Sequence, residues 1–113
     1  MDRFLAVYVI RYYSHFMTDE EKFAYKHLGV QSKMSHASSP EFRAFWEAKL
    51  STIPDILKLT ECGLEEFELR TAERIMQLHG SKIHLNYCPA CGKIAKTPKA
   101  KQCRFCFYDW HSA

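Results

Sequence analysis

The sequence of 113 residues contains few glycines and no long apolar run. Its four glycines, at positions 29, 63, 80 and 92, are too scattered to form a loop that holds a phosphate group. The apolar stretch from Phe4 to Ile10 is seven residues long, far short of the roughly 20 that a membrane helix needs. It follows Asp2 and lacks the basic start and the cleavage site of a secretory signal. We therefore expect a cytoplasmic protein that makes no use of the membrane.

Signatures of catalysis are missing as well. The chain has no Gly-x-Ser-x-Gly, no His-Glu-x-x-His and no kinase-like sequence. None of its glutamates is followed by a histidine three residues later, which excludes the di-iron sites of helical bundles. We expect a protein that is not an enzyme, and nothing in the sequence indicates a small-molecule substrate.

Apolar residues are plentiful and helically spaced in the first 80 residues. Hydrophobic residues make up 47% of the chain, enough to form a folded core. Their spacing predicts helices over residues 4–16, 18–28, 40–50, 53–61 and 64–79. Thr18 and Glu21 form a capping-box pattern at the start of the second helix, and Gly29 is expected to end it. Residues 29–39 are polar and without period, which predicts a loop.

The last of these helices has two distinct faces. The apolar face is expected to consist of Leu64, Phe67, Thr71, Ala72, Ile75 and Met76, and the solvent face of Glu65, Glu66, Glu68, Arg70, Glu73, Arg74 and Gln77. After Gly80, residues 82–87 alternate apolar and polar side chains, which predicts a strand.

Two Cys-x-x-Cys pairs follow this strand, formed by Cys88, Cys91, Cys103 and Cys106. Without an export signal, such pairs indicate metal ligands rather than disulfides. Two residues between thiolates let the chain wrap a metal as a tight knuckle, which Pro89 stiffens and Gly92 completes with an open backbone conformation. The spacing C-x2-C-x11-C-x2-C is typical of a zinc ribbon, in which two knuckles supply four sulfur ligands. We predict one Zn²⁺ ion at this site.

Other uses of the four cysteines remain open. Iron in a rubredoxin-like site and a redox-active dithiol pair are alternatives, with zinc favoured. Four thiolates leave no open coordination position, so the zinc would be structural. Its binding contributes on the order of 10 kcal/mol, which a small module with little core needs in order to fold. The fifth cysteine, Cys62, stands apart and is expected to be inert.

Charge is distributed unevenly along the chain. Residues 1–80 carry a net charge of −2, and residues 81–113 a net charge of +5. Five cations lie between or within the cysteine pairs and are candidate contacts for an anionic partner: Lys93, Lys96, Lys99, Lys101 and Arg104. The alternative is that the lysines only keep a small module soluble.

Aromatic and histidine residues near the cysteines have two interpretations each. The aromatic residues near the cysteines are Phe105, Phe107, Tyr108 and Trp110. They are suited to stacking on nucleobases, but the favoured interpretation is that they form a small core for the ribbon. His84 and His111 flank the ribbon and are placed to support the ligands, although plain surface positions are favoured.

The chain resembles a family of short, uncharacterised bacterial proteins. The resemblance rests on residues 69–75, on residues 85–89 through 109–111, and above all on the segment 95–106, which reads AKTPKAKQCRFC. Residues 12–28 are similar too. Where such proteins commonly have glycine after the last cysteine, this chain has Phe107. The family has no assigned activity, so the resemblance implies zinc binding and a bacterial cytosol.

Together these observations predict a mainly α protein with a small β zinc ribbon, an α+β fold. Residues 1–80 form the helical domain and residues 81–113 the ribbon. The first functional hypothesis is a non-enzymatic adaptor that binds nucleic acid, or a protein bound to nucleic acid, through the basic ribbon. The second is a module that binds another protein or associates with itself as a homo-oligomer, with the aromatic N-terminal helix as contact surface and a structural zinc ion. An iron electron carrier is a weaker third.

Overall fold

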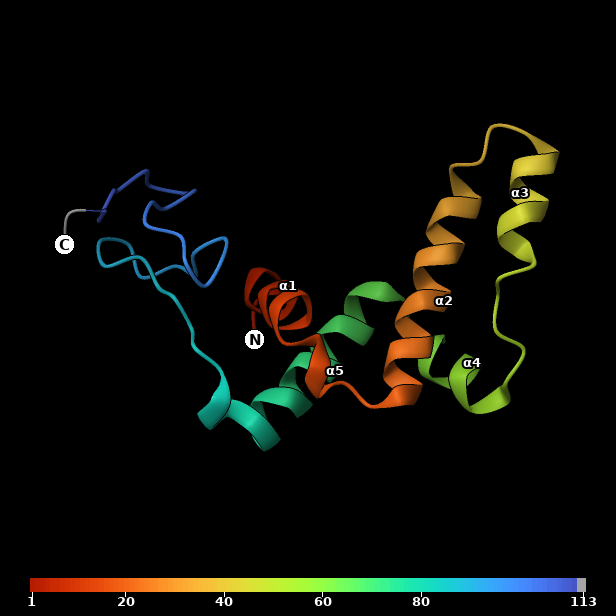
Figure 1. The fold of residues 1–113 in the computed structure, drawn as a ribbon, viewed down its shortest axis with the longest axis horizontal. Coiled ribbons are helices and arrows are strands. Elements are labelled where there is room, and N and C mark those ends of the chain that lie inside the picture. The colour runs from red at the N-terminus through yellow and green to blue at the C-terminus, as the bar shows by residue number, and fades with distance from the viewer. Residues whose placement is uncertain (112–113) are drawn as a thin grey trace.

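The computed structural model describes residues 1–111, which form an elongated helical molecule with a loop-rich module at one end (Figure 1). Its principal extents are 51 × 34 × 19 Å. Five α-helices occur in the order α1 (Arg3–Tyr12), α2 (Asp19–Ser35), α3 (Pro40–Glu47), α4 (Pro54–Thr60) and α5 (Leu64–His79). Short 3-10 helices lie at Ser14–Phe16 and Gly80–Lys82. We call residues 1–80 the helical body and residues 81–111 the cysteine module.

The core of the helical body forms where α1 lies on α5. Val9 and Ile10 of α1 and Ile75 of α5 are almost completely buried there. Helix α2 also contacts α5 and continues away from it, with α4 beside the part of α2 that lies near α5 and α3 beside its far part (Figure 1). As a result, the cysteine module and α3 lie at opposite ends of the molecule.

Helix α2 extends further than the sequence predicted. The capping box at its start is present, with the Thr18 amide donating to the Glu21 side chain (2.8 Å) and the Glu21 amide donating to the Thr18 hydroxyl (3.1 Å). The predicted end at Gly29 is wrong, because the helix continues through it to Ser35. Val30, immediately after Gly29, is 4% exposed. Burying this side chain offsets the roughly 1 kcal/mol that a mid-helix glycine costs.

Helix α5 has the predicted bounds, but of its predicted solvent-facing residues one is buried and another is only partly exposed. Glu68 is buried against the helical body. Arg74 is partly buried, its Nε donates to Glu21 Oε2 of α2 (2.8 Å), and its Nη2 donates to the carbonyl of Phe16, just before α2 (3.0 Å). The Glu21 carboxylate therefore caps α2 and ties it to α5 at the same time.

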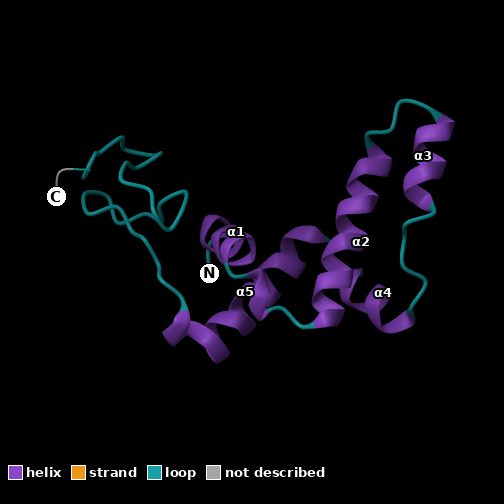
Figure 2. Ribbon diagram, in the orientation of Figure 1, coloured by secondary structure: helices purple, strands orange, loops and turns teal. Residues whose placement is uncertain are grey.

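The strand predicted over residues 82–87 is absent. Figure 2 shows helices joined by loops, and no strand occurs among residues 1–111. Only two isolated antiparallel bridges form, Tyr87 with Ile94 and Gln102 with Asp109. Ile83 and Leu85 alternate with polar residues because they pack against the core of the helical body. No helix of the described chain combines the length and apolarity that crossing a membrane requires.

Candidate metal centre

The first knuckle, at residues 88–93, is closed by hydrogen bonds within its own backbone. The Cys88 amide donates to the Lys93 carbonyl and the Gly92 amide donates to the Cys88 carbonyl, both at 2.9 Å. The amides of Ala90 and Cys91 point at the Cys88 sulfur, each at 3.4 Å. Gly92 has a φ of +76°, the left-handed conformation that glycine adopts without strain. The open backbone conformation predicted for this glycine is confirmed.

The second knuckle, at residues 103–108, repeats this pattern bond for bond. The Cys103 amide donates to the Tyr108 carbonyl (2.9 Å) and the Phe107 amide to the Cys103 carbonyl (3.0 Å). The amides of Phe105 and Cys106 point at the Cys103 sulfur, at 3.3 and 3.5 Å. Phe107 occupies the place of Gly92 with a φ of +65°. A residue with a Cβ pays about 1–2 kcal/mol for that conformation, so the second knuckle is closed under strain.

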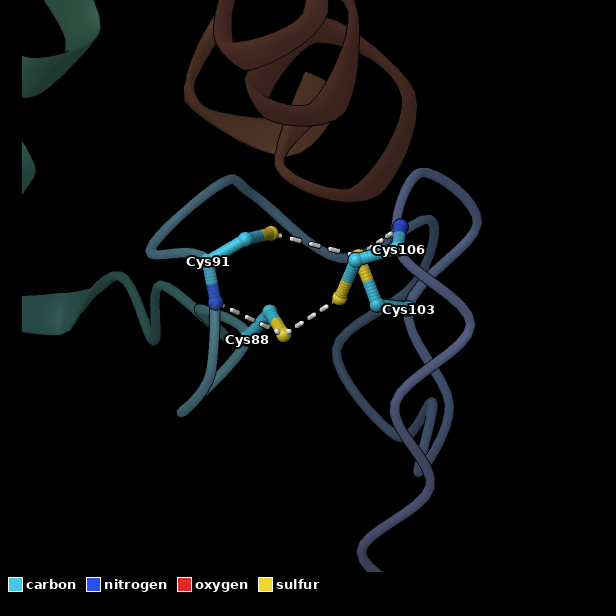
Figure 3. Close-up of side chains that lie close together, drawn as sticks. All are labelled: Cys88, Cys91, Cys103 and Cys106. Carbon is cyan, nitrogen blue, oxygen red and sulfur yellow. Dashed lines mark hydrogen bonds between the residues drawn. The ribbon is translucent and has the colours of Figure 1, made fainter.

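The two knuckles face each other and bring the four cysteine sulfurs together (Figure 3). All four sulfurs lie within 4.8 Å of one another. The Cys88 and Cys106 sulfurs are 3.6 Å apart, and the Cys91 and Cys103 sulfurs are 3.5 Å apart. A tetrahedral zinc ion with bonds of about 2.3 Å to sulfur holds its ligands about 3.8 Å from one another. The distances are too long for disulfides and close to those of a four-thiolate site, so the four cysteines lie close enough to bind one metal ion.

The knuckle amides lower the pKa of the cysteine they surround. The Cys106 amide is the main cause at Cys103, where it lowers the pKa of the thiol to about 6 against the opposing effect of burial. Burial raises the pKa of Cys88, but hydrogen bonds from the Cys91 and Ala90 amides outweigh it and the net shift is downward. The lowered pKa favours the thiolate form of Cys88 and Cys103, which is the form that binds metal.

Cys106 shows the opposite shift. The backbone N–H of Tyr108 lowers its pKa, but burial and the neighbouring thiols Cys88, Cys103 and Cys91 raise it to about 11. Sulfurs this close repel one another when all are ionised, and a cation between them removes that repulsion. The arrangement is chemically suited to a cation that soft sulfur ligands prefer.

Asn86 holds the two knuckles in register, a role that the sequence did not reveal. Its side-chain NH2 group donates to the backbone carbonyls of Thr97 (3.0 Å) and Ala100 (2.9 Å). Its backbone carbonyl accepts from the Ala95 amide (2.7 Å). These bonds tie the segment before the first knuckle to the loop that leads to the second. Asparagine before a metal knuckle carries no distinctive sequence signal, which is why it was missed.

The cysteine module packs on α1 through aromatic and cationic side chains. The ring of Phe105 meets the ring of Phe4 edge to face, with centroids 5.0 Å apart. Arg104 lies over both rings, 4.7 Å from the Phe4 centroid and 5.0 Å from that of Phe105. The Tyr8 hydroxyl donates to the His84 carbonyl (2.7 Å). The N-terminal helix is thus committed to contacts inside the chain.

The five predicted cations divide into two groups. Lys93 and Arg104 stack on Phe105, Lys93 with its Nζ 4.8 Å from the ring centroid. All five are exposed, and Lys96, Lys99 and Lys101 are the three for which no stacking on a ring is seen among residues 1–111. Within residues 1–111 none of the five forms an ion pair. The ammonium groups of Lys96, Lys99 and Lys101 therefore face solvent rather than a carboxylate of the described chain.

Cys62 and the two predicted histidines lie apart from the four sulfurs. Cys62 is half-buried against the core of the helical body. His84 contacts α1 through its backbone, and His111 pairs with Asp109. Of the aromatic residues, Trp110 is buried with the cysteines, as expected of a small core.

No family model matches this chain, and no curated protein or solved structure matches it significantly. The geometry of the cysteine module is therefore the basis for a functional conclusion.

Proposed function

We propose that Cys88, Cys91, Cys103 and Cys106 bind one structural zinc ion, and that the module folded around it binds nucleic acid. The observation that carries the first part is the convergence of four sulfurs within 4.8 Å, two of them already bonded by paired amides. Zinc is preferred over iron because it is the usual occupant of a closed four-cysteine site in this spacing. Such a site has no open position, so the ion supplies folding energy rather than catalysis.

Charge and exposure support the second part. Residues 81–113 carry a net charge of +5, and the one acid among them, Asp109, pairs with His111. The exposed Lys96, Lys99 and Lys101 lie in the loop between the knuckles. Cations held close together on a small module repel one another, and a polyanion relieves that repulsion while releasing counterions. A nucleic-acid backbone meets this description.

Binding to single- and double-stranded DNA and RNA, measured at several salt concentrations, tests the proposal. We expect binding that weakens steeply with salt, and a variant with Lys96, Lys99 and Lys101 changed to glutamine that binds less tightly with a shallower salt dependence. A matched control changes three exposed lysines of the helical body, Lys22, Lys26 and Lys58, to glutamine. Because both variants lose the same charge, only a local site makes the first weaker than the second. Equal losses in the two variants contradict a site on the module.

Self-association is the second candidate function, and α3 is the feature that favours it. This helix has no buried residue, and its Phe42 and Phe45 are 49% and 54% exposed. The N-terminal helix, which the sequence suggested as the contact surface, packs on α5 and the cysteine module instead. Sedimentation of the parent and of a Phe42→Ser, Phe45→Ser variant tests this candidate. A parent that remains monomeric at high concentration rejects it.

A further inference from the structure

Phe107 combines an unfavourable backbone conformation with an exposed ring. It is the one residue other than glycine with a positive φ among residues 1–111. Its side chain is 70% exposed, the most exposed large hydrophobic side chain of the described chain. The backbone role of this position is to donate to the Cys103 carbonyl, and Gly92 fills the same role in the first knuckle without strain. The fold therefore gains little from the phenylalanine ring.

Strain retained without a gain in packing indicates a role at the surface. No ring among residues 1–111 stacks on Phe107, whereas Phe105 in the same knuckle packs on Phe4. Tyr108, the next residue, is also nearly half exposed and lies parallel to Trp110, with ring centroids 6.3 Å apart. Two neighbouring aromatic rings thus reach solvent at one edge of the cysteine module.

A lysine accompanies these rings. The Gln102–Asp109 bridge and the hydrogen bond from the Trp110 amide to the Lys101 carbonyl (2.8 Å) place Lys101 opposite Trp110. The Cys103 amide donates to the Tyr108 carbonyl (2.9 Å) in the same pairing, so the exposed Lys101 lies only two residues along the paired segments from Tyr108. An exposed cation beside exposed rings matches a ligand that has both flat faces and negative charge.

We propose that Phe107 and Tyr108 stack on unpaired bases of a single-stranded nucleic acid while Lys101 contacts its phosphates. This inference rests on the proposed function and narrows it to one class of nucleic acid. Base faces are available to aromatic side chains only where the strand is unpaired. Because stacking does not depend on the identity of the base, we expect little sequence preference.

The Phe107→Gly substitution tests the proposal, because it should leave the melting temperature unchanged or raise it, and yet weaken binding to single strands. The glycine relieves the strain of the second knuckle, so the zinc-loaded variant should melt at the same temperature as the parent or a higher one. Loss of the ring should weaken binding to a single-stranded oligonucleotide by about tenfold or more. Phe107→Tyr keeps the ring and the strain, and should bind like the parent. An oligonucleotide containing 2-aminopurine adds a direct readout, since stacking quenches this base and Phe107→Gly should reduce the quenching while Phe107→Tyr should not.

Three outcomes overturn the inference. One is a Phe107→Gly variant that loads zinc and binds single strands as tightly as the parent. Another is an equal loss of affinity for single- and double-stranded nucleic acid, which removes the role of unpaired bases. A parent that binds neither rejects the proposed function itself and this inference with it. Zinc content measured for each variant separates a loss of affinity from a loss of folding.

Discussion

The helical body and the cysteine module are stabilised by different interactions. The body buries apolar side chains from α1, α2, α4 and α5 in one cluster. The cluster of the module has four buried residues, Cys88, Ala95, Cys103 and Trp110, and two of them are candidate metal ligands. Regular backbone pairing in the module is limited to two isolated bridges. A segment with so little core depends on another source of folding energy, which the metal provides in our account.

The interface between the two parts is specific but small. Ile94 of the module reaches the core cluster of the body, and Arg104 lies over Phe4 of α1. Docking of this kind orients the module without replacing its internal stabilisation. We therefore expect changes at the cysteines to act mainly on the module, and changes in the core to act mainly on the body.

The largest expected effect follows from removing a metal ligand. Cys88→Ser or Cys106→Ser should unfold the module, because binding of the metal contributes on the order of 10 kcal/mol and a serine oxygen replaces a thiolate poorly. In ¹H–¹⁵N NMR spectra the amide signals of residues 81–111 should collapse while those of α5 persist. Cys62→Ser is the matched control and should be nearly neutral, since Cys62 is half-buried and remote from the cluster. Equal effects of the Cys62 and Cys88 substitutions would show that the ligands are misassigned.

The next effect belongs to the helical body, where Arg74 bonds Glu21 and the Phe16 carbonyl. Arg74→Met should lower the free energy of unfolding by about 2 kcal/mol, between the values typical of exposed and of fully buried pairs. Glu21→Gln should cost a similar amount because the same carboxylate caps α2. Chemical denaturation of both single variants and of the double variant measures the coupling. Zinc affinity should be unchanged throughout, and a large loss of zinc binding would contradict the separation of the two parts.

Replacing glycine by alanine should lower the stability of the cysteine module but raise that of the helical body. Gly92→Ala places a Cβ at a φ of +76° and should destabilise the module by about 1 kcal/mol. Gly29→Ala lies within α2, where an added Cβ meets nothing within 4 Å, and should stabilise the body by about 0.5–1 kcal/mol. Thermal melts of the zinc-loaded variants test both. Loss of stability in Gly29→Ala would show that α2 does not continue past this residue.

The smallest effect concerns the buried Glu68 and depends on pH. Burial raises the pKa of its carboxyl group, with Arg3 and Arg11 opposing the rise and Glu65 adding to it. A raised pKa in the folded state means that ionised Glu68 costs stability above its unfolded pKa, and that this cost disappears as the pH falls below it. Glu68→Gln should therefore stabilise the body by up to about 1 kcal/mol at pH 7 and by nothing near pH 4. The exposed Glu66, paired with Arg70, is the control, and Glu66→Gln should show no such gain.

Local signals in the sequence predicted the cysteine cluster and the helix starts well. The spacing of the cysteines identified the residues whose sulfurs converge, because a knuckle is built from a few consecutive residues. Thr18 with Glu21 and Ser39 with Pro40 marked helix starts correctly for the same reason. These features depend on neighbours along the chain, which a sequence displays directly.

Features that depend on distant residues were predicted poorly. Glycine at position 29 predicts a helix end, but packing with distant residues buries Val30 and α2 continues to Ser35. The periodicity of α5 predicts a solvent-facing Arg74, because the sequence does not reveal that its partner, Glu21, lies 53 positions away. Residues 82–87 alternate as a strand does, but without a continuous partner they remain an extended segment. The resemblance shows that Phe107 stands where glycine is common, but its positive φ and its exposed ring are visible only in the structure.

The metal content of the purified full-length protein tests the central claim most directly. Elemental analysis should find about one zinc ion per chain in a colourless protein. Substitution with Co²⁺ should produce the absorption of a tetrahedral thiolate site, which Cys88→Ser should lose. A protein with one iron and a thiolate charge-transfer spectrum, or a metal-free protein whose cysteine module remains folded in a chelator, would contradict the account.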